Sequence, residues 1–159
     1  MSSEAVPEQE LLVDVHLLRY PLRLGMRTSE HYEEVFREFA LLASAQPQSV
    51  ESVPHRMIAL IDALGRRYAR QQDHEIEREE ALRRGEVVRD LVIHVPISAL
   101  EASRTLDRML DETDDFCRDG TLLTLAPPED VVAFRRWYLD ECIAQVEGRA
   151  ATPWPGDLT

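Results

Sequence analysis

The sequence predicts an α+β fold that is predominantly helical, with two β-α-α units, a small sheet and four or five helices, one of them long and charged. Two short segments, 11–20 and 87–95, alternate apolar and polar residues, as half-buried strands do. The stretches that follow each of them repeat apolar residues every three or four positions, which is the spacing of amphipathic helices. The 159 residues fit one domain, and 44% of them are hydrophobic, enough for a core without disulfides.

We expect a single globular domain of residues 11–148. Residues 1–10 are polar and acidic, which indicates a disordered lead-in. They lack the apolar core of a signal peptide. Residues 149–159 are rich in proline and small side chains and predict an extended C-terminal tail, in which Trp154 can dock. No apolar run approaches the roughly 20 residues of a membrane helix, so we expect a cytoplasmic protein.

The first unit begins with the strand at 11–20. Gly25 separates this strand from a helix that we expect to start at Thr28 and Ser29, whose hydroxyl groups can cap it. The apolar spacing then predicts that this helix ends near Ala45.

A second helix of the first unit follows at 52–68. Helix-forming, mostly charged residues continue beyond it to Arg84. The sequence therefore predicts either one long helix whose second half projects into solvent, or a break near Asp73 followed by a separate charged helix. Gly85 ends the helix in both cases. A homo-oligomer assembled through the charged helix at 70–84 is compatible with this pattern.

The second unit begins with the strand at 87–95 and continues into a helix at about 97–118, which Gly120 stops. The short apolar segment 121–125 is either a third small strand or a packed turn. Two prolines then open the last helix, which spans about 127–148. The two halves share their order of elements, and both an internal duplication and a coincidence of two ordinary β-α-α runs stay open.

The charge of the chain limits its partners. The formal net charge is −12, and all eighteen basic residues are arginine; lysine and asparagine are absent. The absence of both residue types, which have AT-rich codons, indicates a high-GC bacterial genome. Because nucleic acids and anionic lipids are polyanions, we expect neither nucleic acid nor membrane as a partner, and a protein partner should be neutral or basic.

Several kinds of chemistry lack their sequence motif. Without lysine, and without a glycine-rich phosphate motif, a conventional P-loop is impossible. No GxSxG nucleophile elbow occurs, and residues 115–126 begin like a calcium loop but lack its later oxygen ligands. We interpret the acids at 111–115 as the solvated face of a helix. Cys117 and Cys142 are expected to be reduced, buried thiols. We therefore predict no cofactor and no metal, and we lean against an enzyme.

Two groups of polar residues near the strands are candidate ligand- or partner-binding residues. Arg19, Arg23 and Arg27 recur every four residues and share one side of a strand or a helix, where they could receive a carboxylate or phosphate, or pair with nearby acids. His16 and His94 lie on the two predicted strands and approach each other if the strands pair. They are hydrogen-bonded structural residues or a pH-sensitive polar site. A pocket near these five residues would suit the alternative function, a small-molecule sensor or an enzyme.

Arg136 and Trp137 form a second candidate group, in the last helix. Both fall off the main apolar stripe of that helix. An off-stripe tryptophan beside an arginine indicates either a second packing surface, which the tail with Trp154 could cover, or an interface with a partner, where tryptophan and arginine are the preferred anchors.

Three segments carry a resemblance to a family: VHLLRYPLRLGMRTSEHYEEVFREFALL at 15–42, DETDDFCRDGTLLTLAPPEDVVAFRRWYLDE at 111–141, and TPWPG at 152–156. The chain resembles an uncharacterised family of small actinobacterial proteins that tend to accompany anti-sigma regulatory kinases and their STAS-type antagonists. The resemblance implies a part in partner-switching control of transcription and supplies no catalytic residues. With the missing motifs and the acidic surface, it favours a non-catalytic regulatory or adaptor protein whose partners are signalling proteins.

Overall fold

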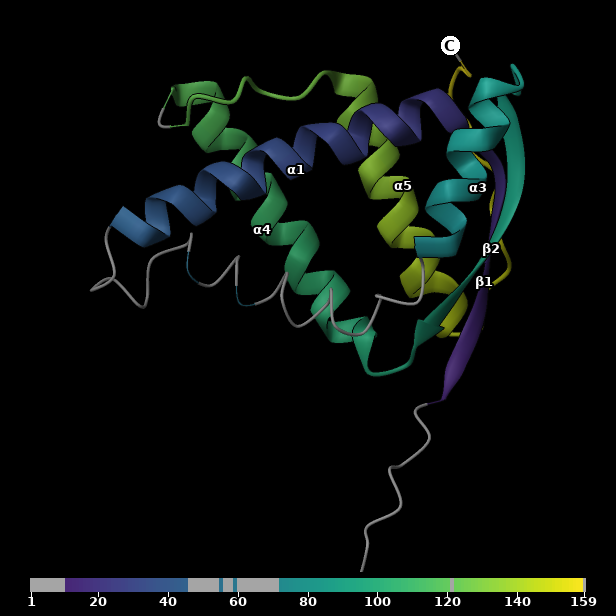
Figure 1. Cartoon of the computed structure of the whole chain (residues 1–159). Coiled ribbons are helices and arrows are strands. Elements are labelled where there is room, and N and C mark those ends of the chain that lie inside the picture. Colours follow the sequence, from purple (N-terminus) through teal and green to yellow (C-terminus); the bar gives the residue numbers. More distant parts are fainter. Residues whose placement is uncertain (1–10, 46–54, 56–58, 60–71, 121, 159) are drawn as a thin grey trace, which may run out of the picture.

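The computed structural model describes residues 11–45, 55, 59, 72–120 and 122–158. Figure 1 shows two long strands at one side of the molecule and helices on their inner side. In chain order the elements are β1 (Leu12–Pro21), α1 (Leu22–Ala45), α3 (Gln72–Arg83), β2 (Val88–Pro96), α4 (Ala99–Asp119) and α5 (Glu129–Val146). The predicted class, α+β and mostly helical, is confirmed, and both strands lie where the alternation predicts them.

In the described residues, β1 and β2 form a two-stranded antiparallel sheet. The inner face of the sheet is apolar and buried against the helices, because alternate side chains of a strand point to the same side. This face consists of Val15, Leu17, Leu91, Ile93 and Val95. The pairing is irregular between Leu17 and Tyr20, where Arg19 adopts a φ of 56°.

α5 is the central helix of the fold, and it contacts β1, α1 and α4. Its predicted apolar residues Val131, Phe134, Leu139 and Cys142 are buried. Trp137, which falls off that stripe, is buried as well, because α5 has neighbours on most of its sides.

The predicted start of the first helix is wrong. α1 begins at Leu22, directly after β1, so Gly25 lies within its first turns and does not separate the two elements. The Leu22 N–H donates a hydrogen bond to the carbonyl of Val87 at 3.1 Å. The Thr28 hydroxyl donates to the carbonyl of Leu24 within the helix and does not cap its N-terminus. A Cβ on Gly25 would lie 2.3 Å from the hydroxyl of Tyr20, so this turn needs glycine to admit the tyrosine.

α3 does not project into solvent. Its Ala81 is fully buried, and Arg78 donates a hydrogen bond to the hydroxyl of Tyr20 at 3.1 Å. Gly85 follows the helix with a φ of 82°, the conformation expected of a helix stop. The helix predicted at 52–68 lies outside the described residues except for two helical positions, His55 and Ala59. The proposed duplication and the oligomer through residues 70–84 stay predictions.

The described part of segment 121–125 forms a packed turn and not a strand. The carboxylate of Glu38 in α1 accepts hydrogen bonds from the N–H groups of Leu123 and Thr124 and from the threonine hydroxyl. Leu122 is buried, whereas Leu123 and Leu125 are exposed to solvent. The Glu38 carboxylate therefore holds the turn through backbone N–H groups of the turn, and the side chains of Leu123 and Leu125 remain exposed to solvent.

The C-terminal tail docks along β1. The N–H of Trp154 donates to the carbonyl of Leu18 at 3.0 Å, and the indole N–H of Trp137 donates to the carbonyl of Thr152 at 3.0 Å. The Arg19 guanidinium donates to the carbonyls of Trp154 and Gly156, both at 2.8 Å. Trp154 is consequently buried, as its predicted docking requires.

Candidate functional site

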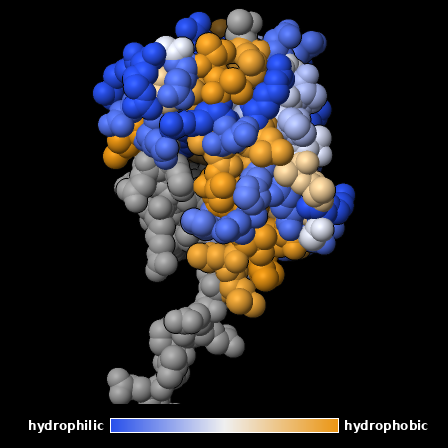
Figure 2. All heavy atoms as spheres, turned by 90° about the vertical axis from the view of Figure 1, so that its right-hand side faces the viewer, coloured by the Kyte–Doolittle hydropathy of each residue, from blue (hydrophilic) through white to orange (hydrophobic). Residues whose placement is uncertain are grey.

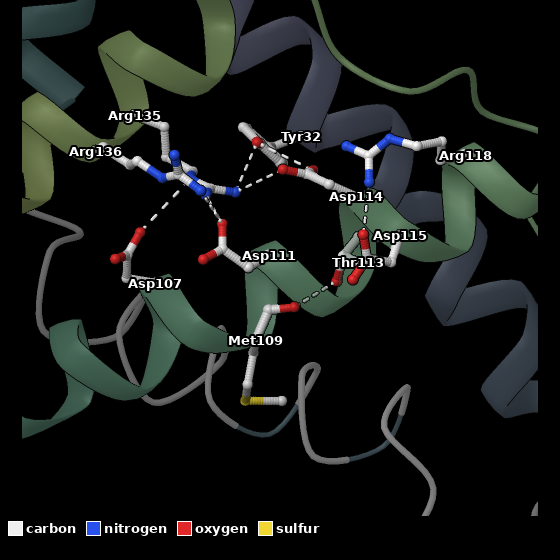
Figure 3. Close-up of polar contacts among 10 residues, drawn as sticks. All are labelled: Tyr32, Asp107, Met109, Asp111, Thr113, Asp114, Asp115, Arg118, Arg135 and Arg136. Carbon is white, nitrogen blue, oxygen red and sulfur yellow. Dashed lines mark hydrogen bonds and ion pairs between the residues drawn. The ribbon is translucent and has the colours of Figure 1, made fainter. Parts of the chain in front are cut away.

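Arg135 stands at the centre of a buried polar cluster in which α1, α4 and α5 meet (Figure 3). Its side chain is 4% exposed. One terminal nitrogen donates to the Tyr32 hydroxyl at 3.0 Å and to Asp114 at 2.9 Å, and the other donates to Asp111. The Nε atom lies 3.6 Å from an oxygen of Asp107, and neither atom has a hydrogen bond. One cation thus joins residues of three helices.

The three aspartates of this cluster differ in acidity. Burial raises the pKa of Asp107 and of Asp114, although the positive charge of Arg135 opposes it. Burial also acts on Asp111, but the hydrogen bond and charge of Arg135 outweigh it and lower that pKa. Arg136 donates to Asp111 at 3.2 Å, so two guanidinium groups face three carboxylates. The cluster therefore has an excess of negative charge when all three are ionised.

The interpretation of residues 111–115 as a solvated acidic face is wrong in part. Asp114 is 3% exposed, and Thr113 is fully buried with its hydroxyl donating to the carbonyl of Met109 (Figure 3). The sequence contains a signal for this site, since Asp107, Asp111 and Asp114 recur at a helical spacing. This spacing does not identify the residues that the aspartates contact, however, because Arg135 and Tyr32 come from other helices.

Beside the Arg135 cluster lies an open cleft of about 350 Å³ between α1, α3, α4, α5 and the end of β1. Arg78 of α3 lies over one wall, with its guanidinium carbon 5.7 Å from the centre of the Tyr20 ring. The aromatic side chains that line the cleft are Tyr20, Tyr32, Phe36, Phe134 and Tyr138.

A smaller groove of about 220 Å³ adjoins the cleft, between α1 and α3. The two cavities share Tyr20, Ser29, Glu33 and Arg78. Four glutamates line the groove: Glu30, Glu33, Glu75 and Glu79. Sequence reasoning missed both cavities because their walls come from elements far apart in the chain.

The two histidines predicted as site residues lie on the outer face of the sheet, and neither lines the two cavities. Asp14 is opposite His94, and its carboxylate lies 2.7 Å from Nδ1 of the ring. His16 is opposite Val92, so the two histidines are diagonal neighbours on paired strands. The strands bring them to one surface, but not into a pocket.

The three arginines near β1 do not converge on one site. The Arg19 guanidinium donates hydrogen bonds to backbone carbonyls of the C-terminal tail. Arg27 forms an ion pair with Asp130 at 2.9 Å. Arg23 is exposed beside α3. Two of the three therefore have intramolecular partners, but only Arg27 pairs with a nearby acid, as the structural alternative expects.

The tail covers Trp137 but leaves Arg136 exposed. The Trp137 ring lies 5.6 Å from the ring of Trp154, edge to face, and Trp137 is 8% exposed. The off-stripe tryptophan therefore belongs to a second packing surface within the chain. Arg136 is exposed and contacts Asp111.

Burial makes both cysteines poor nucleophiles. It raises the pKa of Cys117 to about 11 and that of Cys142 to about 12. Both are therefore protonated thiols at neutral pH, and the thiolate is the reactive form.

Exposed apolar side chains concentrate on and beside the two strands. Figure 2 shows this side of the molecule, where a hydrophobic band runs between hydrophilic flanks. These residues are between 37% and 72% exposed: Leu11, Leu12, Val87, Val88, Val92 and Ile97. We call them the outer sheet surface.

The two edges of the sheet differ. The side-chain amide of Gln145 accepts a hydrogen bond from the N–H of His16 at 2.8 Å and donates one to its carbonyl at 2.9 Å. The next carbonyl that points outward is that of Leu18, and it accepts a hydrogen bond from the N–H of Trp154. A helix side chain and the tail thus cover the β1 edge at His16 and Leu18. Beside β2, the described part of the chain places no further strand.

The described ranges contain no group of three His, Cys, Asp or Glu side chains that could hold a metal ion. In the same ranges, no helix combines the length and apolarity needed to cross a membrane. No family model, curated protein or solved structure matches the chain.

Proposed function

We propose that this chain is a non-catalytic regulatory or adaptor protein that binds a protein partner through the outer sheet surface. The observation that carries the proposal is the concentration of six exposed apolar residues on and beside two strands. In the register of the sheet, Leu11, Leu12 and Ile97 lie at one end, Val87 and Val88 at the other and Val92 between them. Exposed apolar surface is typical of protein-binding sites. Catalysis has less support, because the candidate residues His16, His94 and Arg19 do not share a pocket.

The β2 edge suggests how the partner binds. An extended segment of the partner can add to an open edge, with backbone hydrogen bonds for affinity and alternate side chains for specificity. On the outer face, side chains of such a segment would lie next to those of Val92 and Asp90 of β2. Because the chain carries a net charge of −12, the matching segment is apolar at alternate positions and neutral or basic elsewhere.

The setting we propose is partner-switching signalling, which the family resemblance of the sequence implies. The candidate partners are then an anti-sigma regulatory kinase or its STAS-type antagonist. Either would present a folded surface or a mobile strand to the outer sheet surface.

Titration calorimetry with the purified kinase and antagonist from the same genome tests the proposal. We expect one of them to bind, and Val92→Lys to weaken binding about tenfold or more, since a charge at the centre of the surface must be desolvated. Leu125→Lys is the matched control, because Leu125 is also exposed but lies in the α4–α5 turn. If neither protein binds, the proposed setting is wrong. Binding that Val92→Lys and Leu12→Glu both leave intact overturns the proposed surface.

A further inference from the structure

We propose that the aromatic cleft between α1, α3, α4 and α5 binds a small organic cation with an apolar body, such as an arylalkyl amine. This site lies on the inner side of the sheet and is independent of the outer sheet surface.

The lining suits an apolar body. The volume of about 350 Å³ lies within the range of small-molecule sites, though near its lower end. The hydroxyl groups of Tyr20 and Tyr32 are already hydrogen-bonded, to Arg78 and to the Arg135 cluster. Both rings are nearly buried, with Tyr20 2% and Tyr32 6% exposed, so the ring surface open to a ligand belongs to the partly buried Phe36 and Tyr138.

The charge around the cleft favours a cation over an anion. Glu33 lines the cleft and the adjoining groove, where three more glutamates surround Arg78. Glu79 is partly neutralised by Arg83 at 3.6 Å, which still leaves an acidic rim. At the inner end, three carboxylates face the guanidinium groups of Arg135 and Arg136. The cleft itself is lined by Glu33, Arg78 and Arg135, so the preference for a cation rests on Glu33 and on the glutamates of the adjoining groove.

The aromatic rings of this cleft already stabilise cations. The Arg78 guanidinium lies 5.7 Å from the Tyr20 ring centre, and that of Arg135 lies 5.8 Å from the Tyr32 ring centre. Both distances are within the range of a cation–π interaction. A third cation, supplied by a ligand, would find the same kind of ring surface at Phe36, with the carboxylate of Glu33 nearby on α1.

Three probes of similar shape test the charge preference: 2-phenylethylamine, 2-phenylethanol and 3-phenylpropionate, titrated against the full chain by ligand-observed NMR. We expect the amine to bind about tenfold more tightly than the carboxylate, with the alcohol between them. A carboxylate that binds as tightly as the amine overturns the proposal. So does an amine that shows no binding at millimolar concentration.

Two variants locate the site, and a third serves as control. Glu33→Gln should weaken amine binding, whereas Arg78→Gln should strengthen it by removing a like charge. Glu34→Gln removes the same charge from the next position of α1, where the side chain is exposed and lines neither cavity, and should change nothing. Equal effects of Glu33→Gln and Glu34→Gln, or weaker binding in Arg78→Gln with an unchanged circular dichroism spectrum, would contradict the assigned site.

Discussion

Arg135 and Arg136 are neighbours in α5 with opposite environments. Arg135 is buried among Tyr32 and carboxylates of α4, whereas more than half of the Arg136 side chain is exposed. Desolvation acts to lower the pKa of Arg135, but the surrounding tyrosine and aspartates outweigh it and raise that pKa. Two identical side chains therefore contribute very differently to stability.

Arg135→Met should lower the free energy of unfolding by about 3–5 kcal/mol, because it leaves the buried Asp114 without its cation. Urea denaturation at pH 7 measures this loss. Arg136→Gln is the matched control and should change stability by no more than about 0.5 kcal/mol. Equal stability losses in the two variants would show that the buried cluster is not a structural element.

His31 makes stability depend on pH. Burial lowers its pKa, and Arg135 acts in the same direction, while Glu34 opposes them. The folded protein therefore binds a proton to His31 less readily than the unfolded chain does. As the pH falls below the unfolded value of about 6.5, the unfolded chain gains the proton first and stability is lost.

His31→Gln should remove this loss between pH 7.5 and 5.5. The contribution of one such group is at most about 1.4 kcal/mol per pH unit, and less here because His31 is partly exposed. Urea denaturation of both proteins at a series of pH values measures the difference. Parallel pH profiles for wild type and variant would contradict the assignment to His31.

Among the elements, the C-terminal tail depends most on contacts made elsewhere. It has no helix or strand of its own in the described residues, yet Trp154 is 5% exposed. Glu141 in α5 accepts the N–H of Thr152 at 3.0 Å, and Arg19 binds two tail carbonyls. A Cβ on Gly156 would lie 2.5 Å from the Trp154 ring, so only glycine fits this fold of the tail.

Trp154→Ala should cost about 3–5 kcal/mol of stability, because it removes a large side chain that packs on Trp137 and Phe134. Thermal and urea denaturation measure the loss. Asp157→Ala is the control, since Asp157 is exposed and contributes only its carbonyl to the tryptophan. A tail that contributes little would leave both variants as stable as wild type.

Elements could be predicted from the sequence where the signal is local. The strands at β1 and β2 follow from alternation over a few residues, and Gly120 ends α4 in the left-handed conformation that glycine favours. The start of α1 could not be predicted, because it depends on a hydrogen bond from Leu22 to Val87, which is remote in sequence. The site around Arg135 could not be predicted for the same reason, since Tyr32 lies 103 residues away.

At the scale of the whole molecule, the dominant property is the net charge of −12. Surface carboxylates repel one another, whereas the ion pair between Arg135 and Asp114 is buried and poorly screened by salt. Salt should therefore relieve repulsion more than it weakens attraction.

Raising sodium chloride from low concentration to about 0.5 M should accordingly increase the melting temperature, because the Debye length falls well below the spacing of most surface charges. Differential scanning calorimetry at constant pH measures the change. A melting temperature that falls with salt would mean that exposed ion pairs, such as Arg27 with Asp130, outweigh the repulsion.

The covered edge of β1 also bears on how far copies of this protein can associate. A sheet with two open edges can grow without end, as fibrils do, because every added strand exposes another edge. Here the side chain of Gln145 is hydrogen-bonded to the backbone of His16, and the tail is hydrogen-bonded to the carbonyl of Leu18. The β2 edge is therefore the more open edge of the described sheet, which favours strand addition by a single partner over continued growth.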